Sequence, residues 1–452
     1  MANISVATFT ELNTACQTSN TITVTAPITV TSTITIPAGV TVSLTGAQLS
    51  TSTAALRHFQ LNGDLELNNI TLDGGTTGGG IVMGNTNGTV SSTLTIDSGT
   101  VIQNCSAQEG AGVLANQNAN IIMNAGEITG NTAIGSVGGG GIFMNAGTFT
   151  MTGGLIYHNS AVQNGGGLYI NLGATATITG TSTPTATLPA LPAIGTPAIY
   201  GNTVGAGTQS ANGGGIFNYG TLNATDALIA NNIVNAAPTT NNGGGLLATD
   251  NAVSILANCL ITGNSAPNGG GISAYLGAAV TLDGTTVTNN DAVFTGGGIR
   301  LDNNGGAPAT LTLEGNNIIS NNNCYYTTTS YGTGGGMWLG TSVVNVVNGT
   351  QLVTNNTSLD GAGIYTSEVS LTDFTVSDNK ASRNGGGICY MLTTATTVSL
   401  SNTTVSSNQA AANGGGLYVA SNGTAGANVD LGPNVVVSAN IATNGGGYYV
   451  AP

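Results

Sequence analysis

The sequence contains few charged side chains, and very few of these are positive. Among 452 residues there are four lysines and arginines (Arg57, Arg300, Lys380 and Arg383) and 18 aspartates and glutamates, which gives a formal net charge of −14. Charged residues make up 5% of the chain, whereas an ordinary soluble domain carries roughly 25%. Because nucleic acids and anionic membranes attract clustered cations, this composition excludes a nucleic-acid-binding protein and a polybasic membrane-surface protein.

Long apolar runs and paired cysteines are also missing. No apolar run approaches the roughly 18 residues of a membrane-spanning helix, so we expect no transmembrane segment. The cysteines are odd in number, widely spaced and without a Cys-x-x-Cys motif, which favours small buried thiols over disulfides; they are Cys16, Cys105, Cys259, Cys324 and Cys389. The first residues lack the basic and apolar regions of a secretory leader, so we expect no signal peptide in this chain.

Glycine, in contrast, is abundant, with 71 residues, and much of it belongs to a repeat. A glycine triplet followed by an apolar residue recurs along the chain, and two degenerate copies read Gly-Ala-Gly. The triplets and their apolar residues are Gly78–Ile81, Gly139–Ile142, Gly165–Leu168, Gly213–Ile216, Gly243–Leu246, Gly269–Ile272, Gly296–Ile299, Gly334–Met337, Gly385–Ile388, Gly414–Leu417 and Gly445–Tyr448, and the degenerate copies are Gly110–Val113 and Gly361–Ile364.

The residues between the triplets alternate with the two-residue period of a β-strand. Apolar and polar residues alternate, as in Val280-Thr-Leu282 and Leu311-Thr-Leu313, and Val, Ile and Thr are frequent. Most repeats are long enough for three short strands and three turns. One coil cannot bury its apolar face alone, so coils must stack. We therefore predict an all-β fold: one parallel β-helix over residues 21–452, with about 15 coils and three strands per coil.

A second motif, apolar-x-x-Asn, precedes most triplets and predicts a common corner of the coils. Its asparagines are Asn131, Asn159, Asn264, Asn290, Asn379, Asn408 and Asn440. In register, their side-chain amides can hydrogen-bond from coil to coil, as in other stacked-strand structures. The alternative is turn geometry alone, because asparagine tolerates the left-handed backbone conformation.

The two ends of the chain differ. Thr8-Phe-Thr-Glu11 is a capping-box pattern, and Phe9, Leu12 and Cys16 have helical spacing, so residues 1–20 are predicted to carry a short helix that caps the first coil. Residues 445–452 break off within a repeat. We expect either another copy stacked head to tail, which builds a filament, or a continuation of the chain to cover this end.

The position after the apolar residue should point outward, because its neighbours on the strand point inward. Aromatic residues hold this position in seven repeats: Phe143, Tyr169, Phe217, Trp338, Tyr365, Tyr418 and Tyr449. Aromatic faces can bind sugar rings or other protein surfaces, which makes the row a candidate binding or assembly face. The alternative is that aromatic residues simply favour strands and one another.

The repeat resembles that of known bacterial surface proteins. Ile128-Thr-Gly-Asn131, the triplet at Gly139–Ile142 and the segment from Ile261 to Ile272 are similar to repeats of bacterial surface β-helix proteins, including the chlamydial polymorphic outer-membrane proteins. The stretch from Thr21 to Gly75 resembles the opening of adhesin-like surface proteins of gut bacteria. The resemblance implies a right-handed, pectate-lyase-like β-helix, surface display and adhesion.

The same fold hosts polysaccharide lyases and glycoside hydrolases, which need convergent carboxylates or carboxylate-bound calcium. Here the acidic residues are thinly spread, and the densest groups are Asp64 with Glu66 and Asp373 with Asp378. Carboxylates could still meet across coils, for example Asp226 and Asp250, which are 24 residues apart. No carboxylate recurs in phase with the triplets, as a calcium-binding β-roll requires. We expect no catalytic residues, no metal and no cofactor.

The sequence therefore predicts a non-catalytic, extracellular or cell-surface β-helix protein with an adhesive or structural role. Its expected partner is another copy of itself, head to tail or side by side, or a surface glycan or protein. A polysaccharide-active enzyme is the alternative, and ice binding by outward threonines between Thr21 and Thr35 is disfavoured by the irregular coil lengths.

Overall fold

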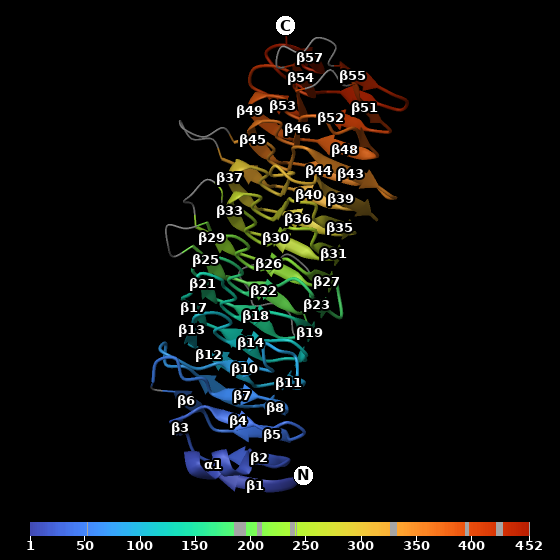
Figure 1. Ribbon diagram of the computed structural model, residues 1–452. Helices are drawn as coiled ribbons and strands as arrows, with labels where there is room; N and C mark the ends of the chain where they lie inside the picture. Colours follow the sequence, from blue (N-terminus) through green and yellow to red (C-terminus); the bar gives the residue numbers. More distant parts are fainter. Residues whose placement is uncertain are drawn as a thin grey trace. The chain divides into compact units, whose positions relative to one another are not determined.

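The computed structural model describes residues 1–51, 53–184, 196–205, 210–235, 240, 242–325, 332–393, 397–421 and 428–451. The chain divides into two compact units, Met1–Asn232 and Ile233–Pro452. Each unit consists of coils whose strands form parallel ladders with the coils before and after them within that unit (Figure 1). A typical coil passes through four short strands, which belong to sheets that we call I, II, III and IV in chain order.

In the first unit, sheet I has the longest strands and sheet III the shortest. Sheet I contains β1 (Ala2–Val6), β2 (Asn20–Val24), β5 (Thr41–Gly46), β8 (Asp64–Asn68), β11 (Ser92–Ile96), β15 (Ala119–Met123), β19 (Gly147–Met151), β23 (Ala174–Thr179) and β27 (Thr221–Thr225). Sheet II contains β3 (Ile28–Val30), β6 (Leu49–Thr51), β9 (Thr71–Asp73), β12 (Val101–Gln103), β16 (Glu127–Thr129), β20 (Leu155–Tyr157), β24 (Ala198–Tyr200) and β28 (Leu228–Ala230). Sheet III contains β13 (Ser106–Ala107), β17 (Thr132–Ala133), β21 (Ser160–Ala161) and β25 (Thr203–Val204). Sheet IV contains β4 (Ile34–Ile36), β7 (Phe59–Leu61), β10 (Ile81–Met83), β14 (Val113–Ala115), β18 (Ile142–Met144), β22 (Leu168–Ile170) and β26 (Ile216–Asn218).

The second unit repeats the same order of strands. In the sheet I position lie β31 (Val253–Ala257), β35 (Ala279–Asp283), β39 (Ala309–Glu314) and β43 (Ser342–Val346), and a separate ladder of β47 (Leu371–Thr372), β51 (Thr397–Ser401) and β55 (Asn428–Leu431). Sheet II contains β32 (Leu260–Thr262), β36 (Thr286–Thr288), β40 (Ile318–Ser320), β44 (Gln351–Thr354), β48 (Phe374–Ser377), β52 (Thr404–Ser406) and β56 (Val436–Ser438). Sheet III contains β29 (Ile233–Val234), β33 (Ser265–Asn268), β37 (Asp291–Thr295), β41 (Asn323–Cys324), β45 (Thr357–Asp360), β49 (Lys380–Asn384) and β53 (Gln409–Ala410). Sheet IV contains β30 (Leu246–Ala248), β34 (Ile272–Ala274), β38 (Ile299–Leu301), β42 (Met337–Leu339), β46 (Ile364–Thr366), β50 (Ile388–Leu392), β54 (Leu417–Ser421) and β57 (Tyr448–Val450).

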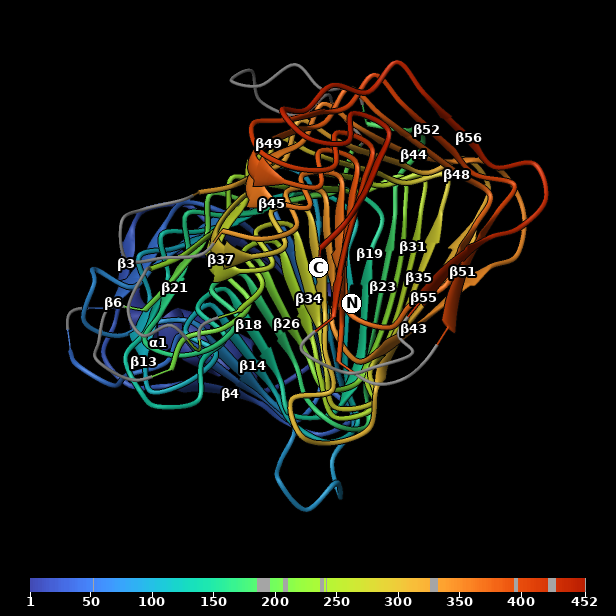
Figure 2. The ribbon, with the colours of Figure 1, turned by 90° about the horizontal axis from the view of Figure 1, so that it is seen from above.

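The parallel ladders confirm the predicted fold class. Successive coils keep their register residue by residue, as where Ile142 of β18 pairs with Leu168 of β22, which in turn pairs with Ile216 of β26. Figure 2 shows β14, β18 and β26 of the first unit in one layer, and β22 pairs between the last two. Among the residues that the structure describes, strands in the sheet IV position number seven in the first unit and eight in the second, in agreement with the predicted number of about 15 coils. The prediction missed the short strand of sheet III, which gives most coils a fourth strand.

The core lies inside the coils, because alternate residues of each strand point inward. In β22, for example, Leu168 and Ile170 are fully buried. All five cysteines are buried and free, which confirms the expected buried thiols.

The glycine triplets lie where successive coils approach most closely. Gly165 has φ +60°, in the left-handed region that glycine adopts without strain. A Cβ on Gly166 would lie 2.5 Å from the carbonyl oxygen of Gly214 in the next coil, and one on Gly167 would lie 2.9 Å from Nδ2 of Asn202. In this triplet the first position therefore excludes a side chain by conformation and the other two by space.

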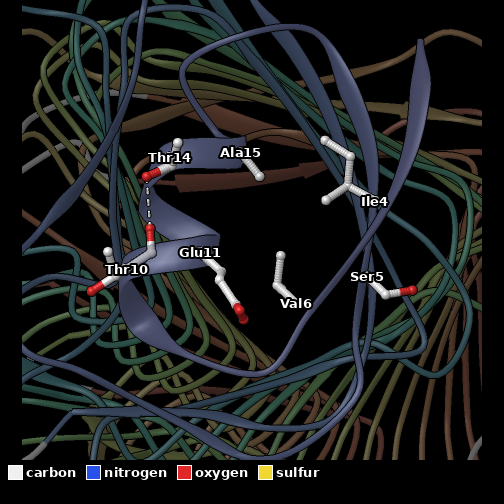
Figure 3. Close-up of a pocket in the computed structure, with 7 residues that line it drawn as sticks. All are labelled: Ile4, Ser5, Val6, Thr10, Glu11, Thr14 and Ala15. Carbon is white, nitrogen blue, oxygen red and sulfur yellow. Dashed lines mark hydrogen bonds between the residues drawn. The ribbon is translucent and has the colours of Figure 1, made fainter.

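A short helix covers the beginning of the first unit, as predicted. Helix α1 (Phe9–Ala15) begins with the complete capping box of Thr8 and Glu11, and its Leu12 and Cys16 are fully buried. Residues 1–20 also contain β1, a strand that the sequence analysis did not predict, and which pairs in parallel with β2. Figure 3 shows a shallow pocket between α1 and β1, where Thr10, Glu11 and Thr14 of the helix lie opposite Ile4 and Val6 of the strand. The predicted boundary between a cap at residues 1–20 and a single solenoid at residues 21–452 stays a prediction.

Candidate functional site

The predicted asparagines stack at one corner of the coils, and their amides form a continuous ladder within each unit. Asn131 donates from Nδ2 to Oδ1 of Asn159 (2.9 Å), and its backbone N–H donates to the same oxygen (3.0 Å). Its second Nδ2 hydrogen reaches the carbonyl of Ile102 at 3.0 Å. Asn290 makes the same two bonds to the next asparagine: its Nδ2 and its backbone N–H both donate to Oδ1 of Asn322, each at 3.0 Å. Asn131, Asn159, Asn290 and Asn322 are fully buried with their amide hydrogen bonds made, which confirms the ladder.

The ladder contains more members than were predicted, and its turn geometry differs from the expected one. Four further asparagines belong to it and fit the same apolar-x-x-Asn spacing: Asn202, Asn232, Asn322 and Asn356. The left-handed residue is the one before each ladder asparagine, as at His158 (φ 50°), Asp378 (φ 57°) and Ser407 (φ 58°). The residue before the asparagine therefore adopts the left-handed turn conformation, and the asparagine side chain forms the hydrogen bonds of the ladder.

The predicted aromatic row exists in both units, but in the first unit it is buried. Phe143, Tyr169 and Phe217 pair in register, with ring centroids 4.6 and 4.7 Å apart. Their exposed fractions are 3–6%, and Tyr219 packs edge-on against Phe217 at 4.8 Å. The expectation of an exposed binding face is therefore wrong for these three residues, because their rings stack closely on one another and Tyr219 packs against two of them.

In the second unit the same row is partly exposed. Arg300, Trp338, Tyr365, Cys389, Tyr418 and Tyr449 occupy it in consecutive coils, and we call these six residues the outer row. The guanidinium of Arg300 lies 5.4 Å from the centre of the Trp338 ring, a cation–π contact. Trp338 stacks on Tyr365 (6.5 Å, 7°) and Tyr418 on Tyr449 (5.8 Å, 5°). All four aromatic residues are half-buried, so part of each ring contacts solvent.

A second polar ladder runs beside the outer row and was not predicted. The residues immediately before the triplets pair from coil to coil, as in the bridges Asn384 to Asn413 and Asn413 to Asn444. Their side chains hydrogen-bond as well, Asn413 to Asn384 and Asn444 to Asn413, both at 2.9 Å. The signal was visible in the sequence, because an asparagine directly precedes most triplets. Asp360 stands in this ladder where most coils have asparagine.

The outer row and the second ladder enclose a pocket of about 440 Å³ in the second unit. Tyr365, Cys389 and Tyr418 of the outer row line it, together with Asp360, Arg383 and Asn384. Asp360 is 5% exposed and forms an ion pair with Arg383. Arg383 Nε donates to both carboxylate oxygens (3.0 and 3.1 Å), and the backbone N–H of Asn384 donates to Oδ1 (3.0 Å).

The electrostatics of this pocket follow from burial and from the ion pair. Hydrogen bonding to Asp360 raises the pKa of Arg383, so the guanidinium stays charged. Burial raises the pKa values of Tyr365, Tyr418 and Cys389, so both phenols and the thiol stay neutral at physiological pH. The pocket thus offers neutral aromatic faces and one mutually neutralised charge pair.

The acidic residues considered in the sequence analysis have structural contacts. Asp64 accepts a hydrogen bond from the backbone N–H of Thr93 (2.8 Å), and Asp226 accepts one from Thr183 (3.2 Å). Asp373 and Asp378 occupy left-handed turn positions. Across the ranges that the structure describes, no group of three His, Cys, Asp or Glu side chains could hold a metal ion.

A further aromatic pair, on sheet II of the first unit, was missed. Tyr157 and Tyr200 stack at 5.0 Å with an angle of 3°, and the Tyr157 hydroxyl donates to Glu127 at 2.7 Å. Both tyrosines stand two residues before a ladder asparagine, so the spacing to Asn159 and Asn202 could have revealed them.

Comparison with known proteins agrees with this architecture. Residues 199–410 match the family model of the right-handed β-helix region. No curated protein and no solved structure matches the chain. The parallel ladders and this match define the class: the chain is a right-handed parallel β-helix repeat protein.

No helix within the part of the chain that the structure describes is both long and apolar enough to cross a membrane.

Proposed function

We propose that the protein is a non-catalytic β-helix displayed outside the cell or at its surface, where it acts in adhesion. Right-handed β-helices occur both in polysaccharide-active enzymes and in surface proteins, so the fold alone does not decide between them. The observation that carries the proposal is the pocket on the outer row of the second unit. It combines stacked aromatic side chains with polar groups, the combination that recognises ligands at protein surfaces.

The state of the pocket's carboxylate supports binding over catalysis. Acid–base chemistry needs a carboxyl group that can exchange a proton with the substrate. Both oxygens of Asp360 already accept hydrogen bonds from Arg383, and Oδ1 also accepts one from a backbone N–H. A carboxylate held in this way serves to fix the shape of the pocket.

Binding and turnover can be separated in one experiment. The purified protein is incubated with neutral and anionic polysaccharides, with and without calcium, and the products are examined by chromatography and by absorbance of unsaturated sugars. We expect retention of the protein on immobilised glycans or on cells without any product. Release of oligosaccharides that stops in the Asp360→Asn variant would establish the enzyme instead.

Assembly into filaments is the second role that the sequence predicts. Copies stacked head to tail would pair their strand edges with one another. Electron microscopy tests this role: we expect particles whose length grows with protein concentration, and monomers at all concentrations would contradict it.

A further inference from the structure

Within the outer row, Cys389 separates two pairs of aromatic residues. The pocket lies at this cysteine. Tyr365, Cys389 and Tyr418 are consecutive partners in register on β46, β50 and β54. Cys389 is the small residue between two tyrosines, and it is 1% exposed, so it forms the floor of the pocket. The aromatic pairs Trp338–Tyr365 and Tyr418–Tyr449 stand on either side of this floor.

The spacing of the strands sets the width of the gap between the two tyrosines. Adjacent strands lie about 4.8 Å apart, so Tyr365 and Tyr418 are separated by roughly 9.5 Å along the stack. Subtracting one carbon–carbon contact distance of about 3.5 Å leaves roughly 6 Å between the ring surfaces. A flat aromatic ring, about 3.5 Å thick, would fit loosely, whereas a saturated six-membered ring with its axial hydrogens is thicker and fits the gap better.

The polar residues of the pocket, Arg383 and Asp360, favour a ligand that carries hydroxyl groups and no net charge. Arg383, whose side chain is 46% exposed, presents guanidinium hydrogens beyond those bonded to Asp360. The carboxylate of Asp360 neutralises this cation, and the chain as a whole carries a net charge of −14. An anionic ligand would therefore meet no uncompensated positive charge here, whereas the oxygen of an uncharged hydroxyl group can accept a hydrogen bond from the remaining guanidinium hydrogens of Arg383.

We propose that this pocket binds one neutral pyranose ring, with its C–H faces against Tyr365 and Tyr418 and its hydroxyls at Arg383, which the buried Asp360 holds in place. The site deepens the adhesive function proposed above and rests on it, since it names the chemical class of the ligand: a neutral hexose unit of a surface glycan. The stacked geometry favours a single ring between the tyrosines, so a terminal sugar is the unit that enters.

The chain carries its own reporter for the test. Trp338 is the single tryptophan of the sequence, and it stacks on Tyr365. The full-length protein is titrated with methyl glycosides of glucose, galactose, mannose and N-acetylglucosamine, and with glucuronate as the anionic probe. Tryptophan fluorescence and saturation-transfer NMR both follow binding. We expect a saturable response to at least one neutral glycoside and no saturable response to glucuronate.

Three variants locate the site. Cys389→Tyr should weaken binding more than 10-fold, because it fills the gap with the side chain that the next coil carries at the same position. Tyr418→Ala, which removes one wall, should weaken it similarly and covers the case in which Cys389→Tyr does not fold. Tyr157→Ala, which breaks the stacked pair on sheet II of the first unit, is the matched control and should leave binding unchanged.

The results distinguish this proposal from the adhesive function. If no neutral glycoside binds, if glucuronate binds more tightly, or if the folded Cys389→Tyr and Tyr418→Ala variants bind as well as the unmodified protein, the sugar site is refuted. Retention of the protein on cells under those conditions would leave adhesion standing. Release of product from polysaccharides would refute the non-catalytic role while leaving the binding result intact.

Discussion

At the scale of single residues, the buried asparagines show why one residue type recurs at one position. An interior ladder amide such as Asn159 uses both Nδ2 hydrogens, and its Oδ1 accepts from the N–H and Nδ2 of the preceding Asn131. A serine or threonine cannot supply two donors, and an aspartate cannot supply any when ionised. Such an amide can be buried in an apolar interior without a large free-energy cost because all its hydrogen-bonding groups have partners.

Removing one ladder amide should destabilise the protein measurably. Asn290 is fully buried, bonds to Asn322 and accepts from Asn264. Asn290→Ala leaves buried partners unpaired, so the free energy of unfolding should fall by about 1–3 kcal/mol, as measured by urea denaturation. Asn413→Ala, in the half-exposed second ladder, is the control and should cost less than about 1 kcal/mol. Equal losses in the two variants would contradict the role of burial.

His58 should make stability depend on pH. It is fully buried, Nδ1 accepts from the backbone N–H of Gly80 at 3.0 Å, and burial lowers its pKa to about 4. Above pH 6.5 the histidine is neutral in both the folded and unfolded states. Between pH 6.5 and 4 the unfolded chain binds a proton that the folded chain does not, so the free energy of unfolding should fall by about 3 kcal/mol over this range.

The His58→Asn variant isolates this effect. An asparagine Oδ1 can take the place of Nδ1 as acceptor for Gly80 and does not titrate. Urea denaturation at pH 6.5 and pH 4 should show a smaller loss of stability in the variant than in the unmodified protein, and the carboxylates common to both cancel in the comparison. An identical loss would show that His58 does not contribute.

At the scale of one coil, the glycine triplet is the element that allows close stacking. The third glycine of a triplet faces the ladder asparagine of the next coil, as Gly416 faces Asn440. Its lack of a side chain therefore has a steric cause that depends on the presence of the neighbouring coil.

Two glycines at the same position of consecutive triplets make a matched pair for testing this cause. A Cβ on Gly416 would lie 2.6 Å from the carbonyl oxygen of Gly447 and 2.7 Å from Asn440 Nδ2, whereas the nearest atom to a Cβ on Gly447 is Val437 Cγ1 at 3.6 Å. Gly416→Ala should lower the free energy of unfolding by about 1–3 kcal/mol or more through overpacking. Gly447→Ala should change it by less than about 1 kcal/mol in the same denaturation assay. The steric explanation fails if the two variants lose the same stability.

At the scale of the whole molecule, the scarcity of cations has a consequence for proteolysis. Arg300 lies in β38, and Lys380 and Arg383 both lie in β49. Arg57 bonds through its guanidinium to the carbonyls of Glu109 and Gly110. A protease needs an extended segment free of such bonds, so each of the four possible trypsin sites is protected by structure.

We therefore expect the native protein to resist trypsin. Incubation at room temperature should leave the chain intact on a denaturing gel, and heating through the unfolding transition should release fragments ending at the four cations. The heated sample is the control for accessibility of the sites. Cleavage after Lys380 or Arg383 in the native protein would show that β49 opens under native conditions.

The repeat, and every feature that depends on local spacing, could be predicted from the order of the amino acids alone. The strand period, the glycine triplets, the capped helix at Thr8 and the asparagine corner could be predicted, because each depends on residues within one coil and on the identity of neighbouring coils. The four missed asparagines and the second ladder followed from the same spacings.

Which outward residues reach solvent, and which side chains meet across coils, depends on how the folded coils pack. Phe143 and Tyr418 occupy equivalent positions in the repeat, yet the first is buried and the second half-exposed, because the rings and turns packed around them differ. Asp360 and Arg383 are 23 residues apart and form an ion pair only because successive coils place one above the other. Solvent exposure and ion pairing depend on the lengths and contacts of neighbouring coils. The periodic pattern of the sequence gives no information about these contacts.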